Sequence, residues 1–325
     1  MKFLFLGKGV SEASTRYRIQ PIYERLAKAG HQVEFVSTEL GLLPKLNLVR
    51  RSNQYDLVFI QRKLFPAWFV RSLKRRAGRL VFDFDDAIFL KSSGESSPSR
   101  YRKFQATCQA ADLILAGNEY LAMQSRKLST KVQVVPTTVD TAAYETDAVK
   151  ASAITLVWIG SSSTRRYLDM LTPVLDSLSQ RRPNLMLKVI ADFEFRLDGL
   201  KVENIQWSSE QEVAELTSSH IGIAPMINNG WTRGKCALKV IQYMAAGLPV
   251  VSDRCGANQE VILASETGYL ADNENDWIEA ITKLIDNEDL RTQMGVAGRA
   301  RAQQLYDMKR VTSQVADQLV ELCGD

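Results

Sequence analysis

The run Asp83-Phe84-Asp85-Asp86 places three carboxylates within four residues. Side chains alternate between two faces of an extended chain, so we expect Phe82 and Phe84 on one face of a strand and Asp83 and Asp85 on the other. Carboxylates this close repel one another unless a ligand, a cation or an arginine stabilises them. An ionised Asp85 is able to orient or deprotonate a hydroxyl group. A divalent-metal site of the Asp-x-Asp type and a salt-bridged structural cluster are the competing interpretations.

A second candidate site lies at Gly234-Lys235 and Lys239, where a predicted loop meets a helix predicted over Leu238–Ala246. Gly234 would leave room for a ligand to approach the backbone. The two lysines are four residues apart, so both can face an anion at the start of the helix. Gln242, one turn further on, offers a neutral amide to hydroxyl groups. The pattern favours a diphosphate over a helix start, and a packed amphipathic helix with solvated lysines is the alternative.

Small and basic residues follow the first predicted strand. Gly7 and Gly9 form a Gly-x-Gly element, but the third glycine of a dinucleotide fingerprint falls on Glu12, which makes NAD binding an unfavoured interpretation. Arg16 and Arg18 lie in the first turn of the next predicted helix, where they could hold a phosphate of a second substrate. A surface helix with solvated arginines is an equal alternative.

The composition is that of a soluble globular protein, with 45% hydrophobic and 24% charged residues in 325. That length predicts two domains. The first 150 residues hold 24 Lys and Arg against 14 Asp and Glu, whereas the rest holds 17 against 23. The basic excess predicts a helical surface for anionic lipid or nucleic acid, with a merely solvated helix as the alternative. Its main residues are Arg62, Lys63, Arg71, Lys74, Arg75, Arg76 and Arg79.

Several classes of chemistry lack their motifs. No Cys/His cluster suggests zinc, and neither a Gly-x-Ser-x-Gly elbow nor a Walker loop is present. His31 and His220 each precede a predicted strand and are expected to be structural. The cysteines show no paired spacing and are expected to be reduced thiols of a cytoplasmic protein.

Strands and helices alternate throughout, which predicts an α/β fold of two doubly wound, Rossmann-like domains with parallel sheets. Such domains bind ligands at the carboxyl ends of their strands, in the crevice between the domains. Strands are predicted at Lys2–Leu6, Gln32–Val36, Leu57–Gln61, Leu80–Phe84, Leu113–Ala116, Val132–Val135, Ile154–Ile159, Leu187–Ile190, Ile205–Trp207, Ile221–Pro225, Pro249–Ser252 and Gly268–Leu270. Helices are predicted at Thr15–Ala29, Pro66–Ala77, Tyr167–Gln180, Gln211–Leu216, Leu238–Ala246, Asp276–Asp286 and Asp289–Leu305.

The polar segment Asp140–Ser152 is the predicted linker between domains spanning residues 1–146 and 152–307. Residues 308–325 are predicted to form a helix that crosses back to the first domain.

The stretch Gly234–Ser252 resembles the donor-binding segment of GT-B glycosyltransferases, in particular the retaining family 4. Met244–Val251 matches the end of that family's Glu-x7-Glu motif. The two glutamates of the motif contact the donor sugar and the nucleotide ribose, and they fall here on Gly234 and Gln242. In these departures the stretch is similar to a variant with a Gly-Lys-x3-Lys element.

The resemblance extends to the start of the second domain. Gly160 and Ser161 directly follow the predicted strand Ile154–Ile159, where the family has a strand ending in glycine. The resemblance implies that these two residues bind the nucleoside or the sugar of the donor. Arg165 or Arg166 falls where a basic residue of the family neutralises the donor diphosphate.

In the first domain, the resemblance concerns the acceptor. Asp85 and Asp86 fall where the family has a His–Asp step near the acceptor, and Gly9 lies in a loop that lines the crevice. The resemblance therefore implies that Asp85 acts on the acceptor hydroxyl and that Asp86, Gly9, Arg16 and Arg18 contact the acceptor.

The resemblance implies transfer of a sugar, with retention, from a UDP- or GDP-sugar to a hydroxyl acceptor. The diphosphate would be stabilised by Lys235, Lys239 and Arg165, so neither an obligatory metal nor another cofactor is expected. The basic first domain suggests a lipid-linked acceptor, as in polysaccharide biosynthesis. We expect a cytoplasmic protein, peripheral on the inner face of the membrane, that does not bind nucleic acid. A non-catalytic nucleotide-sugar-binding protein and a GT-B nucleotide-sugar epimerase are the alternatives.

Overall fold

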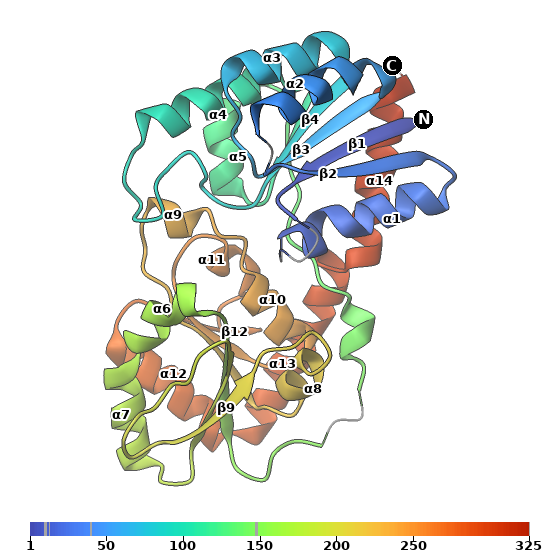
Figure 1. Ribbon diagram of the computed structural model, residues 1–325. Helices are drawn as coiled ribbons and strands as arrows, with labels where there is room; N and C mark the ends of the chain where they lie inside the picture. The colour runs from blue at the N-terminus through green and yellow to red at the C-terminus, as the bar shows by residue number, and fades with distance from the viewer. Residues whose placement is uncertain (10–11, 13, 40, 147–148, 325) are drawn as a thin grey trace. The chain divides into compact units, whose positions relative to one another are not determined.

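The computed structural model describes residues 1–9, 12, 14–39, 41–146 and 149–324. The chain divides into two compact α/β units (Figure 1). The first unit contains Met1–Thr138, Asn229–Cys236 and Met308–Asp325, and the second contains Val139–Asn228 and Ala237–Asp307. The chain therefore passes from one unit to the other four times. The predicted linker Asp140–Ser152 includes residues 147 and 148, which lie outside the described residues.

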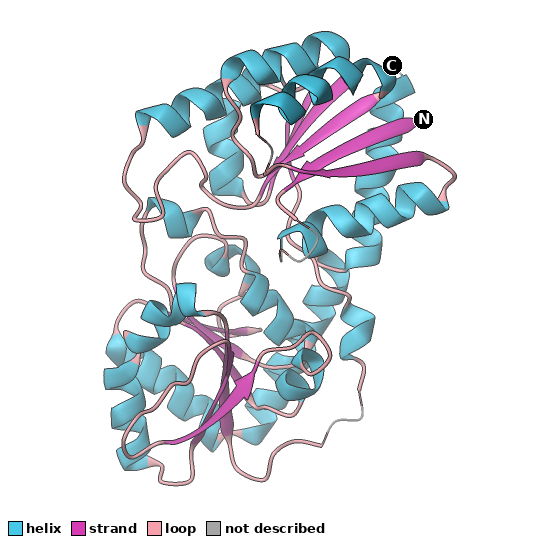
Figure 2. Cartoon of the chain, viewed as in Figure 1, coloured by secondary structure: helices cyan, strands magenta, loops and turns pink. Residues whose placement is uncertain are grey.

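The first unit is built on six parallel strands in the order β2-β1-β3-β4-β5-β6 (Figure 2). Each lies within one residue of its predicted bounds, because strands buried on both faces form continuous apolar runs. The strands are β1 Lys2–Gly7, β2 Gln32–Ser37, β3 Leu57–Gln61, β4 Arg79–Phe84, β5 Leu113–Ala116 and β6 Val132–Val134.

Helices cover both faces of this sheet. On one face, Phe5 and Phe59 pack with Ile22 of α1 and with Val315 and Leu319 of α14. On the other face, α3 and α4 cover the apolar side chains of β3 and β4. The helices are the π-helical turn η1 Thr15–Ile19, α1 Gln20–Lys28, α2 Leu42–Arg51, the 3-10 turn η2 Ser52–Gln54, α3 Ala67–Arg76, α4 Pro98–Ala110, α5 Glu119–Arg126, α9 Gly230–Arg233 and α14 Met308–Gly324.

The second unit repeats this architecture with the strand order β12-β11-β10-β7-β8-β9, all parallel. Its strands are β7 Thr155–Ile159, β8 Met186–Ala191, β9 Lys201–Gln206, β10 Ile221–Ala224, β11 Val250–Asp253 and β12 Gly268–Ala271. Strand β9 begins four residues earlier than predicted, because it is an edge strand whose polar residues face solvent.

The helices of the second unit place an amphipathic face against this sheet. Leu175 and Leu178 of α7 and Trp277 and Ile281 of α12 share one core with Val189 of β8. The helices are η3 Thr141–Tyr144, η4 Ser162–Thr164, α6 Arg165–Asp169, α7 Thr172–Arg181, α8 Glu212–Thr217, α10 Leu238–Ala245, α11 Asn258–Val261, α12 Glu274–Asp286 and α13 Glu288–Leu305. Within the described parts of the chain, no helix combines the length and the apolarity needed to cross a membrane.

Each sheet has one point at which the order of strand addition reverses. In the first unit it lies between β1 and β3, and in the second unit between β7 and β10. In doubly wound folds, ligands bind outside the carboxyl ends of the strands at this switch point. The residues that follow β1, β3, β7 and β10 are therefore the first candidates for a functional site.

Candidate functional site

Asp83 belongs to a buried ion pair. The guanidinium of Arg18 donates to both carboxylate oxygens of Asp83, with distances of 2.5 to 3.1 Å, and Nη1 of Arg18 donates to the carbonyl of Val135. The two side chains are only 4% and 3% exposed. Burial raises the pKa of Asp83, and Arg18 opposes that shift. The alternative of a surface helix with a solvated arginine is therefore wrong for Arg18, because its guanidinium is buried and paired within the protein. Its contact with an acceptor phosphate stays a prediction.

Asp85 and Asp86 face a second arginine, Arg62, which follows β3. The Nε of Arg62 lies 3.7 Å from Oδ1 of Asp85, and its Nη2 pairs with Asp86. The backbone N–H of Arg62 donates to the carbonyl of Asp83 over 2.7 Å. Arg62 has a φ of 51°, in the left-handed region that costs a residue with a Cβ about 1–2 kcal/mol. Arginines thus stabilise the acidic run, and no group of three metal-ligating side chains occurs among the residues described.

Asp86 lies between two cations. Besides Arg62, it faces Lys235, whose Nζ is 3.7 Å from Oδ1 of Asp86. The Asp86 side chain is 7% exposed. Burial raises its pKa, while Lys235 and Arg62 oppose that shift. The structure therefore assigns Asp86 two partners within the protein, where the sequence predicted contact with an acceptor.

Asp85 differs from its two neighbours. Its side chain is 15% exposed, and its Oδ1 is buried with no hydrogen-bond partner among the described residues. Its backbone carbonyl accepts a hydrogen bond from Sγ of Cys236 over 3.2 Å. On the opposite face of the strand the rings of Phe82 and Phe84 stack at 5.0 Å, as the alternation predicted. Asp85 is thus the carboxylate of the run that retains capacity to accept a proton or a hydrogen bond.

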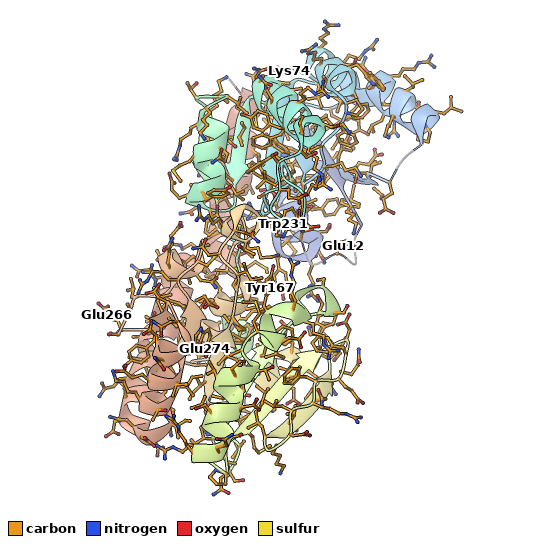
Figure 3. The ribbon with its side chains drawn as sticks, turned by 90° about the vertical axis from the view of Figure 1, so that its left-hand side faces the viewer. Glu12, Lys74, Tyr167, Trp231, Glu266 and Glu274 are labelled. Atoms are coloured by element: carbon orange, nitrogen blue, oxygen red, sulfur yellow. The ribbon has the colours of Figure 1, made fainter. Side chains whose placement is uncertain are left out.

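The segment Asn229–Cys236 is held in the first unit by Asn118. The Nδ2 of Asn118 donates to the carbonyls of Arg233 and Lys235, each over 3.0 Å, and its Oδ1 caps α5 by accepting from the N–H of Leu121. The Nζ of Lys235 lies 5.9 Å from the ring centre of Trp231, which Figure 3 labels. This segment was predicted as loop in the second domain.

Gly234 is needed for a different reason from the one predicted. A Cβ at this position would lie 2.6 Å from the backbone nitrogen of Ala87 and 2.7 Å from its Cβ. Ala87 therefore occupies the room that the sequence suggested for a ligand.

Lys235 belongs to the first unit and Lys239 to the second, since the chain passes between the units after Cys236. Lys235 precedes α10, whereas Lys239 lies in the first turn of that helix. Ala237, between them, has a φ of 55° and starts the helix from the left-handed region. The four-residue spacing predicted that the two lysines extend side by side from one helix face. The structure differs, because only Lys239 lies in the helix.

Helix α10 is fixed to the switch point of the second sheet by Tyr243. The Tyr243 hydroxyl accepts from the N–H of Ile159 in β7 over 2.9 Å and donates to the carbonyl of Ile223 in β10 over 3.2 Å. The ring fits against Gly222, where a Cβ would lie 2.4 Å from it. Burial raises the pKa of Tyr243, so the hydroxyl stays protonated. These two hydrogen bonds thereby fix α10 to the carboxyl ends of β7 and β10.

Lys239 lies beside the turn that follows β7. Its Nζ is 4.0 Å from the ring centre of Trp158 and 3.5 Å from Oγ1 of Thr164. A Cβ at Gly160 would lie 2.8 Å from this Nζ and 2.3 Å from the Trp158 ring, so glycine is required there. Ser161 forms a capping box with Thr164. The structure thus brings together Gly160, Ser161 and Lys239, all of which the sequence assigned to the donor.

Arg165 joins this group through aromatic side chains. Its guanidinium lies 5.1 Å from the ring centre of Phe193, and Phe193 packs edge-to-face with Trp158. Arg165 is about half exposed, and its Nε lies 3.5 Å from a carboxylate oxygen of Asp169. Arg165 and Lys239 therefore cover the two rings of one aromatic pair, which places two cations at the carboxyl end of β7.

Gln242 is buried, with 3% exposure. Its Nε2 donates to Oε1 of Glu212 over 2.7 Å, and the other oxygen of Glu212 accepts from the indole of Trp207. The amide therefore contacts a carboxylate within the protein, whereas the sequence suggested that it is presented to hydroxyl groups.

Gly9 and Arg16 have neighbours within their own segment of the chain. The space around a Cβ at Gly9 is open, and the carbonyl of Gly9 accepts from the N–H of Glu12. Arg16 stacks on Tyr17, with its guanidinium 4.9 Å from the ring centre. Their predicted contact with an acceptor stays a prediction.

Only some of the basic residues predicted to form a surface around α3 are exposed. Arg62 belongs to the carboxylate cluster, Lys74 pairs with Asp112, and Nε of Arg79 donates to the carbonyl of Leu322. Trp68, Arg71 and Arg75 remain exposed on α3 at positions i, i+3 and i+7, which form one stripe.

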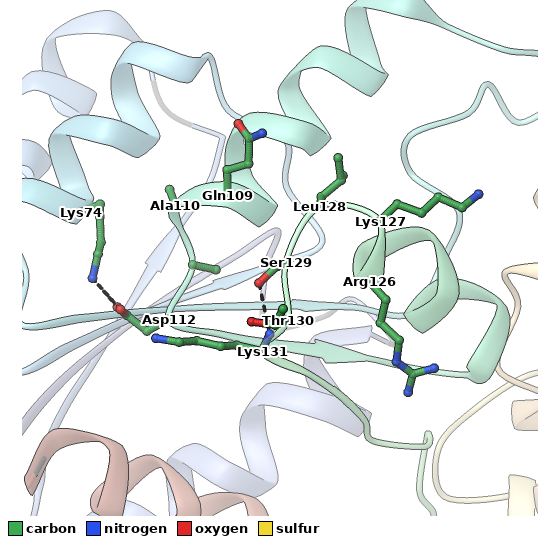
Figure 4. Close-up of a pocket in the computed structure, with 11 residues that line it drawn as sticks. Lys74, Gln109, Ala110, Asp112, Arg126, Lys127, Leu128, Ser129, Thr130 and Lys131 are labelled. Atoms are coloured by element: carbon green, nitrogen blue, oxygen red, sulfur yellow. Dashed lines mark hydrogen bonds and ion pairs between the residues drawn. The ribbon is translucent and has the colours of Figure 1, made fainter.

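Lys74 also lines a groove of about 560 Å³ at the amino-terminal edge of the first sheet (Figure 4). Asp112 precedes β5 and Lys131 precedes β6 at this edge, and Arg126 and Lys127 complete the charged lining. The groove therefore lies at the opposite edge of the sheet from Asp85.

Known proteins resemble this chain over parts of its length. Residues 153–287 match the family described as Glycosyl transferases group 1. The chain is 26% identical over 138 residues to the D-inositol 3-phosphate glycosyltransferase of Pseudarthrobacter chlorophenolicus, and 31% identical over 77 residues to spore coat protein SA of Bacillus subtilis. These segments are 42% and 23% of this chain, and they span only 31% and 20% of the length of the two relatives.

Solved structures resemble the chain over nearly its whole length. Sucrose-phosphate synthase from Thermosynechococcus elongatus superposes with a TM-score of 0.79 at 14% identity, covering 99% of both chains. HepE from Anabaena, solved with UDP-glucose, superposes with a TM-score of 0.73 at 14% identity, covering 99% of this chain and all of the other. The protein therefore has the α/β GT-B fold, as the sequence predicted.

Proposed function

We propose that this protein is a glycosyltransferase that uses a nucleotide-diphosphate sugar as donor. The observation that carries the proposal is the pair of cations, Lys239 and Arg165, at the carboxyl end of β7. These cations stand beside the switch point, where doubly wound folds bind ligands. Preorganised positive charge stabilises the diphosphate that leaves when the glycosidic bond breaks. The match of residues 153–287 to group 1 glycosyl transferases, and a neighbour solved with UDP-glucose, support the same donor class.

Substitution of Lys239 tests this donor site. Lys239→Ala removes a charge-assisted contact worth about 1.5–3 kcal/mol, so the Kd for UDP or GDP should rise about 10- to 100-fold. Lys201→Ala, at an exposed lysine of β9 in the same unit, is the matched control and should leave the Kd unchanged. Calorimetric titration with both nucleotides measures it. An equal Kd for UDP or GDP in the two variants would show that Lys239 does not bind the nucleotide.

The proposal assigns the acceptor to the first unit and gives Asp85 the proton of its hydroxyl. The unsatisfied Oδ1 of Asp85 supports this assignment. The group 1 resemblance favours retention. The acceptor oxygen bonds to the sugar carbon as the bond from that carbon to the diphosphate breaks, and the hydroxyl proton passes to Asp85. Asp85→Asn should lower turnover while nucleotide binding stays at the wild-type level; wild-type turnover in this variant would return Asp85 to a structural role.

No metal or other cofactor enters this proposal. Lys239 and Arg165 supply the positive charge on the donor side that a metal ion supplies elsewhere. Turnover is therefore expected to be the same with EDTA as without it. Loss of turnover in EDTA, restored by a divalent cation, would overturn this part.

We further propose that the acceptor is lipid-linked, as for surface polysaccharide, and that the protein works on the inner face of the cytoplasmic membrane. The exposed stripe Trp68, Arg71 and Arg75 on α3 supports this, because it pairs an amphipathic aromatic ring with cations. Binding to phosphatidylglycerol vesicles, absent with phosphatidylcholine vesicles and weakened in Arg71→Glu/Arg75→Glu, is the expected result. Equal binding by that variant would contradict the assignment of the stripe.

A non-catalytic nucleotide-sugar-binding protein is the second candidate, favoured by the buried Gln242 and by Gly234 where the family has glutamates. UDP or GDP binding without turnover would support it.

A further inference from the structure

Arg62 combines two unusual features at one position. Of the non-glycine residues described, only Arg62, Ala237 and Ser265 have a left-handed backbone. Arg62 follows β3, so it stands at the switch point of the first sheet, and its N–H is fixed by the carbonyl of Asp83 in β4. Backbone strain persists where the surroundings hold it, and it concentrates at functional sites.

The side chain of Arg62 lies against two adjacent carboxylates. Its Nε is 3.7 Å from Asp85, and Nη2 pairs with Asp86. Other charged or titratable groups also act on this pair. They are Arg18 and Asp83 of the buried ion pair, Lys235 and Cys236 of the segment Asn229–Cys236, and Glu12, which acts on Arg62. Among the residues that the structure describes, Arg62 is the cation that forms an ion pair with both Asp85 and Asp86.

We propose that Arg62 is a positioning residue that balances the charge of the Asp85–Asp86 pair and aims Asp85 at the acceptor hydroxyl. This inference rests on the proposed function of Asp85. Without Arg62, the two carboxylates repel each other; Lys235 still pairs with Asp86, and Arg18 is already paired with Asp83. Proton uptake by the pair is then favoured, and a protonated Asp85 cannot accept the proton of a hydroxyl. The left-handed backbone of Arg62 accompanies the placement of its guanidinium beside Asp85 and Asp86.

The pH profile of turnover distinguishes positioning from a purely structural role. With UDP-glucose or GDP-mannose as donor, nucleoside diphosphate release is measured between pH 5 and about 9. Arg62→Gln should move the acid limb of kcat/KM upward by about 1–3 pH units, the usual effect of losing a nearby opposite charge. Arg62→Lys, which keeps the charge, should move it less. Arg62→Gln/Asp86→Asn removes the repelling carboxylate as well and should move the limb back.

Arg62→Gly separates charge from backbone strain. Glycine adopts the left-handed conformation freely, so this variant should show the same upward shift as Arg62→Gln although the strain is relieved. A uniform loss of turnover at every pH in the Arg62 variants, or no recovery in the double variant, would overturn the proposal.

A readout independent of turnover is the carboxyl carbon of Asp86 in protein labelled with 13C-aspartate. Its resonance, assigned by its loss in Asp86→Asn, should titrate at higher pH in Arg62→Gln than in the wild type. If Arg62→Gln does not fold, Arg62→Lys provides the same comparison with a smaller shift. An unmoved midpoint contradicts the role of Arg62. Failure of the proposed function gives a different result, namely wild-type turnover in Asp85→Asn.

Discussion

Three neighbouring carboxylates have three different environments in this protein. Asp83 is buried with Arg18, and Asp86 lies between Arg62 and Lys235. Asp85 has one oxygen that no described residue hydrogen-bonds. The alternation of the strand predicted which face each side chain takes, because that depends on immediate neighbours. It did not predict the partners, since Arg18 lies 65 residues and Arg62 24 residues away along the chain. Tertiary structure therefore decides which carboxylate can do chemistry.

At this scale the buried ion pair makes a prediction about stability. Arg18→Met leaves the Asp83 carboxylate buried without its partner, so the free energy of unfolding of the first unit should fall by about 3–5 kcal/mol. Arg18→Met/Asp83→Leu removes both charges and should recover part of that loss. Urea unfolding followed by tryptophan fluorescence and circular dichroism measures both variants.

The matched control for that prediction is Lys74→Met. Lys74 forms an ion pair with Asp112 in the same unit, but its side chain is 36% exposed, so about 0–1 kcal/mol is expected. If Arg18→Met lowers the free energy of unfolding no more than Lys74→Met does, the buried ion pair of Arg18 and Asp83 is not a main source of stability in the first unit.

At the scale of elements, periodicity and turn residues predicted all twelve strands, and the helix from Leu238 that became α10. Elements that are marked by capping residues and not by an apolar pattern were harder to predict. The helix α4 is preceded by the cap Ser97 and begins with a proline, a signal that local capping rules could have detected. The membership of Asn229–Cys236 in the first unit has no local signal, because it depends on Asn118, more than a hundred residues earlier.

Substitution of Asn118 tests how the segment Asn229–Cys236 is held in the first unit. Asn118→Ala removes both the cap of α5 and the two bonds to the carbonyls of Arg233 and Lys235. Asn118→Ser keeps a capping oxygen, worth about 1 kcal/mol, but cannot make both bonds. Backbone hydrogen exchange, followed by mass spectrometry, should therefore accelerate in Asn229–Cys236 in both variants and in α5 only in the alanine variant.

Comparison of Asn118→Ala with Asn118→Ser separates the capping of α5 from the bonds to the segment Asn229–Cys236. The N–H groups of Gly234 and Lys235 are bonded to the carbonyls of Trp231 and Thr232, so opening of the segment is observable. Wild-type exchange of this segment in Asn118→Ser would show that Asn118 acts only as a helix cap.

At the scale of the whole molecule, the candidate groups are divided between two units of the same fold class. Asp85 and Lys235 belong to the first unit, and Lys239 and Arg165 to the second. The doubly wound architecture was predictable, because alternating strands and helices have few stable arrangements. The identity of donor and acceptor is not encoded in that architecture, since one fold serves many substrates. Function at this scale therefore has to be measured on the full chain.

The most direct measurement is release of nucleoside diphosphate by the purified 325-residue chain incubated with UDP-glucose or GDP-mannose, with and without a lipid-linked acceptor. We predict release that rises with acceptor, appears together with a glycosylated product, and falls at least tenfold in Lys239→Ala but not in Lys201→Ala. Tight binding of UDP or GDP without release across donors and acceptors would contradict a glycosyltransferase and favour a binding protein. Release of a free, epimerised nucleotide sugar would instead identify an epimerase.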